Sequence, residues 1–269
     1  LEDATDATSV VQKILDFTSE WNRVFPLHAM HARRSAWHPY VLSIRIETWI
    51  RLFTLVQVRG VAANDSRMTE LARGVEHMTR VLLRNLEKGT MANHLLRNIK
   101  ALVLAGLFLD TPTGAQARRI GLTLLDRELR EQILEDGCHF ERSPMYHVSM
   151  LNDVLDMAEA MILAGSTVPD RLSDTAARMT AFLAHMRHPD GEIPFFNDST
   201  RSFFLRTPEV LHRGQVLCRE MEWEGVTESS PDGIPSSRMT PAQRRGRNFW
   251  KTHRSRAPVS YTHLRAHET

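Results

Sequence analysis

The stretch that decides the fold class is His94-Leu-Leu-Arg-Asn-Ile-Lys-Ala-Leu-Val-Leu-Ala-Gly-Leu-Phe-Leu109. It is apolar almost all the way round a helix, which is the pattern of a helix buried among other elements. Asp110-Thr-Pro-Thr-Gly114 follows, and its proline and glycine predict the end of this helix. A fully buried helix requires neighbours on every side, so the flanking segments should supply elements that surround it.

Those flanking segments also have the spacing of helices. Apolar side chains recur every three or four residues, and short turn-forming stretches separate the periodic runs. The pattern predicts helices over residues 10–21, 42–58, 66–86, 94–109, 115–134, 144–164 and 169–187. After Pro189-Asp-Gly191 the chain is predicted to be extended, because Ile193, Phe195 and Phe196 come close to alternation.

Helices of similar length, paired through short loops, predict a mainly α fold, an incomplete α/α toroid or solenoid rather than a compact bundle. Beyond about residue 220 the composition changes to a turn-rich stretch and then a basic, aperiodic one. We therefore expect a helical domain over 1–215, the irregular start of a truncated β-rich domain over 216–259, and a non-native tail over 260–269. A polyanion-binding arm is the alternative interpretation of the basic stretch.

Composition excludes several classes of function. The chain has 34 basic and 32 acidic residues, a formal charge of +2, so we expect no nucleic-acid partner. No apolar run is long enough to span a membrane. Two cysteines, Cys138 and Cys218, show no metal-ligand spacing, and no phosphate-binding glycine loop is present. We therefore expect neither a metal nor a cofactor. Because the chain begins at Leu1 rather than Met, we also expect it to be a piece of a longer protein.

The densest group of ionisable side chains is Asp136-Gly-Cys-His-Phe-Glu-Arg-Ser-Pro-Met-Tyr-His147. It has no apolar period and lies between a turn former, Gly137, and a helix breaker, Pro144, which predicts a loop that presents side chains to a ligand. Upstream, Asn93-His94 begins the buried helix. The two groups together indicate proton-transfer chemistry on an anionic substrate.

Three stretches resemble the heparinase II/III family of polysaccharide lyases. They run in the family's order between about Trp37 and Asp198, and they are Asn93 to Gly106, Gly137 to His147, and Pro189-Asp-Gly-Glu-Ile-Pro-Phe-Phe-Asn-Asp198. The resemblance implies an incomplete α/α toroid followed by a β-sandwich, of which little is expected here. It also implies an acidic polysaccharide as substrate and a periplasmic or secreted location.

Such lyases remove the C5 proton of a uronic acid and expel the sugar linked at C4, leaving an unsaturated uronate. The resemblance assigns carboxylate neutralisation to Asn93, with His94 beside it, and catalysis to Tyr146. Donors held against a carboxylate stabilise the charge that develops when the neighbouring carbon loses its proton, as in an oxyanion hole. The family also uses a group from the sandwich domain, which has no counterpart in this chain.

A tyrosine can be the base that takes the proton or the acid that protonates the leaving oxygen, but ionising a phenol requires a nearby cation. Arg142 and His147 are the candidate cations, and His139 is a candidate partner base or sugar contact. Glu141 is predicted either to pair with Arg142 or to act in catalysis.

A second group precedes the buried helix. Trp37, Tyr40 and Arg45 could form a wall that stacks on sugars or binds their carboxylates, whereas Trp49 is predicted to lie in the core. Asp190 and Asn197-Asp198 are predicted to form turns that border the cleft.

Two other functions stay open. The first is a glycoside hydrolase on an α/α toroid, which would need paired carboxylates such as Asp136 or Glu141 with Asp190 or Glu192. The second is a non-catalytic glycan-binding homologue.

Overall fold

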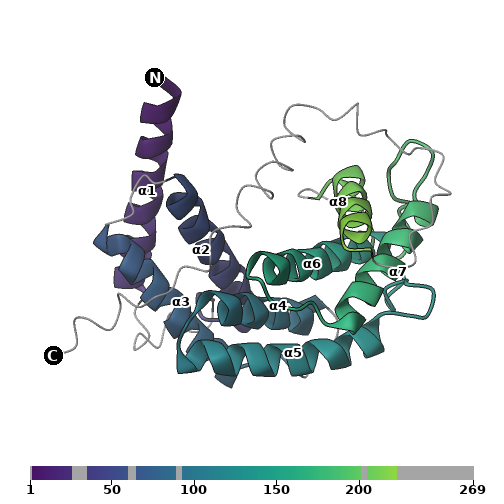
Figure 1. Cartoon of the computed structure of the whole chain (residues 1–269), viewed down its shortest axis with the longest axis horizontal. Coiled ribbons are helices and arrows are strands. Elements are labelled where there is room, and N and C mark those ends of the chain that lie inside the picture. Colours follow the sequence, from purple (N-terminus) through teal and green to yellow (C-terminus); the bar gives the residue numbers. More distant parts are fainter. Residues whose placement is uncertain (1, 26–34, 60–64, 89–92, 201–204, 223–269) are drawn as a thin grey trace. The chain divides into compact units, whose positions relative to one another are not determined.

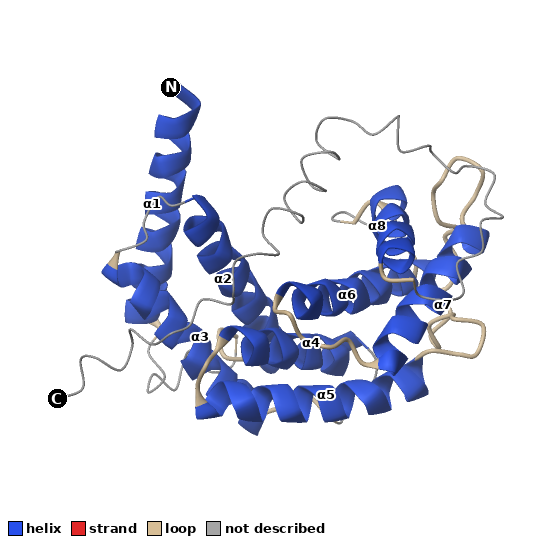
Figure 2. Cartoon of the chain, viewed as in Figure 1, coloured by secondary structure: helices blue, strands red, loops and turns tan. Residues whose placement is uncertain are grey.

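The structure is a computed structural model that describes residues 2–25, 35–59, 65–88, 93–200 and 205–222 (Figure 1). These residues form eight helices and no strand (Figure 2). The helices are α1 Glu2–Val24, α2 Pro39–Arg59, α3 Ser66–Arg84, α4 Asn93–Phe108, α5 Pro112–Gln132, α6 Pro144–Leu163, α7 Asp170–Met186 and α8 Thr207–Glu220.

The mainly α prediction is confirmed, and each of the seven predicted helices corresponds to one of α1–α7. The prediction that helices end at residue 187 is wrong, because α8 follows. Thr207-Pro208 begins it with a proline in the first turn, and Val210, Leu211 and Leu217 are buried on its inner side. The proposed boundary at 215 falls inside α8, and residues 223–269, with the predicted tail, lie outside the described residues.

The segment predicted to be extended is not helical, and it joins no strand in the described part of the chain. Ile193 is buried, whereas Phe195 and Phe196 are about half exposed. The predicted turns at Asp190 and at Asn197-Asp198 are confirmed. Asp190 stabilises the first of them, because its Oδ1 accepts the backbone N–H of Glu192 at 2.9 Å.

The chain divides into two compact units, and each is considered by itself. Unit 1 comprises residues 1–124, and in it α2 packs against α3 and α4 while α1 packs against α3. The prediction that α4 is buried is confirmed: Leu96, Ile99 and Leu102 are fully enclosed. Lys100 is also enclosed, and its ammonium group lies 2.9 Å from the carboxylate of Glu47 on α2.

Unit 2 begins at Leu125, and in it α6 packs against α7 and α8. Twelve residues of α6 are buried, which accounts for most of its length. Arg213 of α8 ties the two helices together, because its guanidinium donates to Asn152, Asp156 and Glu159 of α6 at 2.7–3.1 Å. This network holds α6 in place along its middle and C-terminal half. No helix among the described residues is long and apolar enough to cross a membrane.

Candidate active site

The predicted site residues fall into two groups, one in each unit. In unit 1 the centre of the group is His94, in the first turn of α4. Its Nδ1 lies 2.9 Å from Oε1 of Glu87, and the Nε2 of His38 lies 3.8 Å from the same oxygen. Since the Glu87 side chain is 9% exposed and that of His94 is 36% exposed, a shielded carboxylate holds a ring that still reaches solvent.

Asn98, one turn further along α4, fixes Glu87. It is fully buried, its Nδ2 donates to Glu87 Oε2 and to Ser43 Oγ at 3.1 Å, and its Oδ1 accepts the backbone N–H of Glu87 at 3.0 Å. The carboxylate of Glu87 therefore accepts Nδ1–H of His94, which turns Nε2 outward. No described residue bonds to that Nε2.

Tyr40 is the member of the predicted aromatic wall that lies beside His94, with ring centroids 4.6 Å apart. Trp37 is 7% exposed and packs 5.6 Å from Trp21, and the guanidinium of Arg45 lies 3.9 Å over the Trp21 ring. Burial lowers the pKa of Arg45 to about 10, and its Nη1 donates to the Ala36 carbonyl at 2.8 Å. Trp37 is therefore buried in the packing of unit 1, whereas Arg45 is half-buried and its role stays a prediction.

Two further predictions in unit 1 have different outcomes. Trp49 lies in the core, as expected, with 5% exposure. Asn93 is the first residue of α4, but its side chain lies outside the described residues, so its role stays a prediction.

In unit 2 the loop from residue 133 to 143 connects α5 to α6. Gly137 allows this loop to turn tightly against α7: its φ is +88°, and a Cβ there would lie 2.4 Å from the carbonyl oxygen of Arg178. Asp136 Oδ1 accepts the backbone N–H of Cys138 at 2.9 Å, and Ile133 forms an isolated antiparallel bridge with His139. The predicted loop is therefore a well-defined turn.

His139 and His147 are buried beneath this loop. The Nε2–H of His147 donates to the Met179 carbonyl at 3.0 Å, and its Nδ1 accepts the backbone N–H of His139 at 3.3 Å. The Nε2 of His139 lies 3.4 Å from Oε1 of Gln132. Burial lowers the pKa of each histidine from 6.5 to about 4, so both are neutral at pH 7. This corrects the expectation that His147 is a cation next to Tyr146.

Tyr146 lies in the first turn of α6 and is half-buried. Its phenol takes no hydrogen-bond partner from the described residues, which leaves the hydroxyl available to a ligand. Arg142, four residues earlier, is exposed, and no described residue forms an ion pair with its guanidinium. Of the two cations predicted for this tyrosine, Arg142 is therefore the one whose side chain is exposed.

Glu141 lies beside His139 and not beside Arg142, which corrects the predicted pairing. Its Oε2 is 4.0 Å from Nδ1 of His139, and within the described part of the chain neither atom has a hydrogen bond. Burial raises the pKa of Glu141, and the charge of Asp198 raises it further. A carboxyl group in such surroundings holds its proton more readily than usual.

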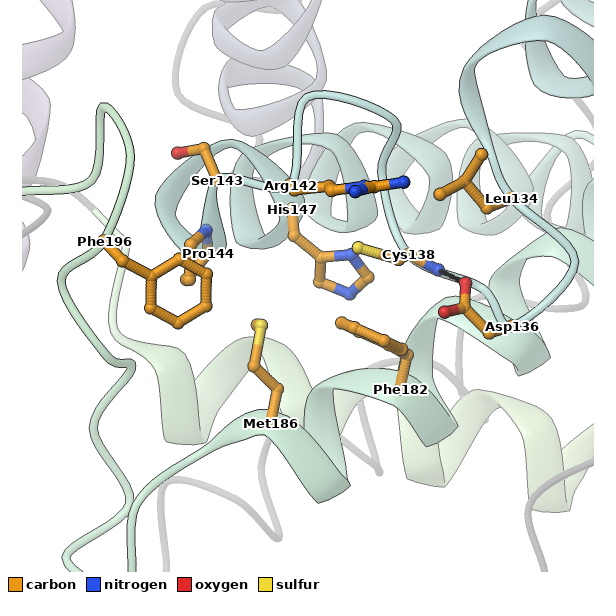
Figure 3. Close-up of a pocket in the computed structure, with 10 residues that line it drawn as sticks. All are labelled: Leu134, Asp136, Cys138, Arg142, Ser143, Pro144, His147, Phe182, Met186 and Phe196. Atoms are coloured by element: carbon orange, nitrogen blue, oxygen red, sulfur yellow. Dashed lines mark hydrogen bonds between the residues drawn. The ribbon is translucent and has the colours of Figure 1, made fainter.

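A pocket of about 300 Å³ opens in unit 2 beside the loop (Figure 3). The rings of Phe196 and Phe182, the Met186 side chain and the ring of His147 surround it, and Arg142 lies along one side. The walls are therefore mainly apolar, with one cation. No group of histidine, cysteine, aspartate or glutamate side chains that could hold a metal occurs among the described residues.

The family model described as the heparinase II/III N-terminus matches residues 3–208. The chain belongs to the heparinase II/III family.

Three relatives define how far this family likeness extends. A heparin-sulfate lyase of Bacteroides stercoris is 29% identical over 170 residues, 62% of this chain and 25% of that protein. The FtsZ-localized protein C of Caulobacter vibrioides is 26% identical over 193 residues, 69% of this chain and 31% of that protein. A solved heparinase III structure has a TM-score of 0.64 at 22% identity, over 79% of this chain and 35% of that one. The chain thus spans about a quarter to a third of these relatives, and the structural match confirms the α/α toroid class.

For this heparinase II/III chain, sequence reasoning missed the residues that hold each of the two groups in place. Glu87 and Asn98 orient His94, and Ser199 bonds to the start of α6. Asn98 carried a signal, because a polar amide in an almost wholly apolar helix needs a buried partner. Glu87 and Ser199 gave no such signal, since their partners are brought to them only by the fold.

Proposed function

We propose that this heparinase II/III chain is part of a polysaccharide lyase that cleaves uronate-containing glycans by β-elimination. The proposed substrates include sulfated, heparan-like glycans. The observation that carries the proposal is the presentation of His94 by a shielded carboxylate at the start of α4, directly after Asn93. A histidine held through Nδ1 can carry a second proton on Nε2 while Glu87 balances its charge. Such an imidazolium is a strong donor to a sugar carboxylate.

The chemistry then follows from the charge that elimination creates. Loss of the C5 proton places a second negative charge on the uronate carboxyl, and donors from Asn93 and His94 stabilise it. The electron pair of the C5–H bond forms the C4–C5 double bond as the C4–O bond breaks. Tyr146 carries out proton transfer. It acts as the base that removes the C5 proton, as the acid that protonates the leaving oxygen, or as both in turn.

Two features of relatives support this assignment. One curated relative is named a heparin-sulfate lyase, and the solved neighbour is a heparinase III. A polymeric substrate of this kind would also place the protein in the periplasm or outside the cell.

The test is to incubate the purified protein with heparan sulfate, alginate and other polyuronates and to follow near-ultraviolet absorbance from the new double bond. Tyr146→Phe should abolish the signal, and Ser173→Ala, a change in α7 that removes only a local hydrogen bond, should preserve it. Reducing ends that accumulate without absorbance would reject elimination.

A hydrolase is the second candidate, because one observation favours it. The pKa of Glu141 is raised by burial and by the charge of Asp198. In glycoside hydrolysis, one carboxyl group with a raised pKa acts as the acid and a second carboxylate acts as its partner. In that case Glu141→Gln would abolish cleavage while Tyr146→Phe would not. A non-catalytic role is the third, since one relative is named for its localisation and not for a reaction. Retained binding to an immobilised polyuronate without turnover would support it.

A further inference from the structure

The N-terminus of α6, which presents Tyr146, lacks a cap of its own. Ser143 occupies the N-cap position with extended backbone, yet its side chain makes no capping hydrogen bond. Pro144 follows and has no N–H, so Met145 supplies the first backbone donor that needs a partner. An uncapped helix start loosens readily, and here it would loosen one residue before Tyr146.

Ser199, far along the chain, supplies the missing acceptor. Its Oγ accepts the backbone N–H of Met145 at 3.1 Å and lies 2.9 Å from Oγ of Ser143. Ser143 is 2% exposed, so the contact is shielded from water. Ser199 therefore takes the place that the side chain of a helix's own N-cap residue usually fills.

Asn197, two residues earlier, holds the turn that precedes α6. Its Nδ2 donates to the carbonyl oxygen of Arg142 at 2.6 Å, and the N–H of Arg142 donates to His139 O at 2.8 Å. Arg142 has a φ of +53°, a left-handed conformation that costs a non-glycine residue roughly 1 kcal/mol. Such a conformation persists only where its surroundings fix it, and it is frequent at functional sites.

We infer that Asn197 and Ser199 are positioning residues that set the direction in which Arg142 and Tyr146 face the substrate. The inference rests on the proposed function of Tyr146 and gives a role to the stretch from Pro189 to Ser199, within which turns that border the cleft were predicted at Asp190 and Asn197-Asp198. Neither residue touches the reacting atoms. Each acts through the backbone, Asn197 on the turn and Ser199 on the first turn of the helix.

A purely structural role for these contacts would show as a loss of stability and not as a loss of rate. The two cases can be separated because α6 has other supports. Val148, Leu151 and Val154 are buried, and Arg213 of α8 binds the helix along its second half. Loss of the cap should therefore loosen the first turn and leave the rest of α6 folded. The rate of the chemical step should change more than the stability of the unit.

The variants are chosen to remove one contact each. Ser199→Ala removes the acceptor, and Ser199→Thr restores a hydroxyl. Asn197→Gly removes the amide without straining the backbone, because Asn197 itself has a φ of +53°. Ser173→Ala is the matched control: Ser173 is half-buried, and its hydroxyl bonds locally to Asp170 O at 2.8 Å.

We expect Ser199→Ala and Asn197→Gly to lower kcat on a polyuronate roughly 10- to 100-fold with KM nearly unchanged, since a small misplacement of a catalytic group has that effect. Ser199→Thr should recover most of the rate, and Ser173→Ala should match the parent protein. Hydrogen–deuterium exchange should show faster exchange at Met145 and Tyr146 in Ser199→Ala, with no change at the centre of α6.

Faster exchange without a fall in kcat would overturn the inference, because the contact would then be structural only. Unchanged exchange would overturn it as well, whatever the rate. If the parent protein eliminates no polyuronate, the proposed function fails by itself. Exchange at the first turn of α6 still decides in that case whether Ser199 is the cap, and unchanged exchange again rejects it.

Discussion

The histidines of unit 1 and unit 2 look alike in the sequence and differ in the structure. His94 is partly exposed, a shielded carboxylate holds one of its ring nitrogens, and the other is available. His139 and His147 are buried, His147 is bonded through both nitrogens, and the pKa of each is lowered to about 4. The comparison teaches that the partner and the exposure of a histidine, and not its place in a motif, decide whether it can work as a charged group.

The largest effect that we expect is on catalysis, and it concerns His94 of unit 1. We expect His94→Gln to lower kcat roughly 100- to 1000-fold, since it removes a donor to the developing charge. The free energy of unfolding in urea should change little, because the ring is partly exposed.

Combining His94→Gln with Tyr146→Phe tests whether the two residues act in one step. Residues that work as a unit are strongly non-additive, so the double variant should lose far less than the product of the two single losses. Fully multiplicative losses would contradict a shared transition state.

The second effect is on stability in acid. The pKa of His147 is lower in the folded protein, so the unfolded chain binds more protons between pH 6.5 and about 4. The contribution of the neutral His147 ring to the free energy of unfolding is complete above pH 6.5 and is lost as the pH falls toward 4. It amounts to roughly 3 kcal/mol for this buried group.

Urea unfolding of unit 2 across that pH range measures the loss. His147→Asn should make the loss with falling pH smaller, with His139 still contributing, and His94→Gln should leave the shape of the curve unchanged. An identical acid response in the His147 variant would contradict the assignment of a buried, neutral ring.

A smaller effect is expected from Asn98→Ala in unit 1. The change leaves a buried carboxylate and a hydroxyl with fewer partners, which costs about 1–3 kcal/mol in the free energy of unfolding. It should also lower kcat, because Glu87 loses the amide that orients it. Thermal unfolding and steady-state kinetics on the same preparation would separate the loss of stability from the loss of kcat. If neither quantity falls, the proposed network is contradicted.

The smallest effect concerns Arg142. Its side chain is exposed, so Arg142→Ala should change the free energy of unfolding by no more than roughly 0.5 kcal/mol. KM or kcat on an anionic glycan should nevertheless worsen, since the pocket loses its cation. Loss of stability with unchanged kinetics would assign Arg142 to the fold and not to the site.

Sequence reasoning was most successful where burial follows a local period. The apolar repeat placed α4 in the core, and the turn former and proline around residues 137–144 predicted the loop that carries Tyr146. It missed α8, although the buried residues of this helix recur at helical spacing, at Thr207, Val210, Leu211, Gly214, Leu217 and Cys218. The helix packs against α7 and α6, and Arg213 binds it to α6.

The parts of the site that could not be predicted depend on contacts between distant residues. The bond from Asn98 to Ser43 joins residues 55 apart, and that from Met145 to Ser199 joins residues 54 apart. The burial of His147 likewise depends on Met179, across the packed faces of α6 and α7. A local pattern shows that polar side chains are present, but not which of them meet.

The most direct test of the account is to identify the products formed from a defined uronate tetrasaccharide by mass spectrometry, with the near-ultraviolet spectrum recorded in parallel. The account predicts one fragment that absorbs and is lighter by one water molecule than the corresponding hydrolysis product. That fragment should disappear in both Tyr146→Phe and His94→Gln. Two saturated fragments, still formed by Tyr146→Phe, would contradict the account.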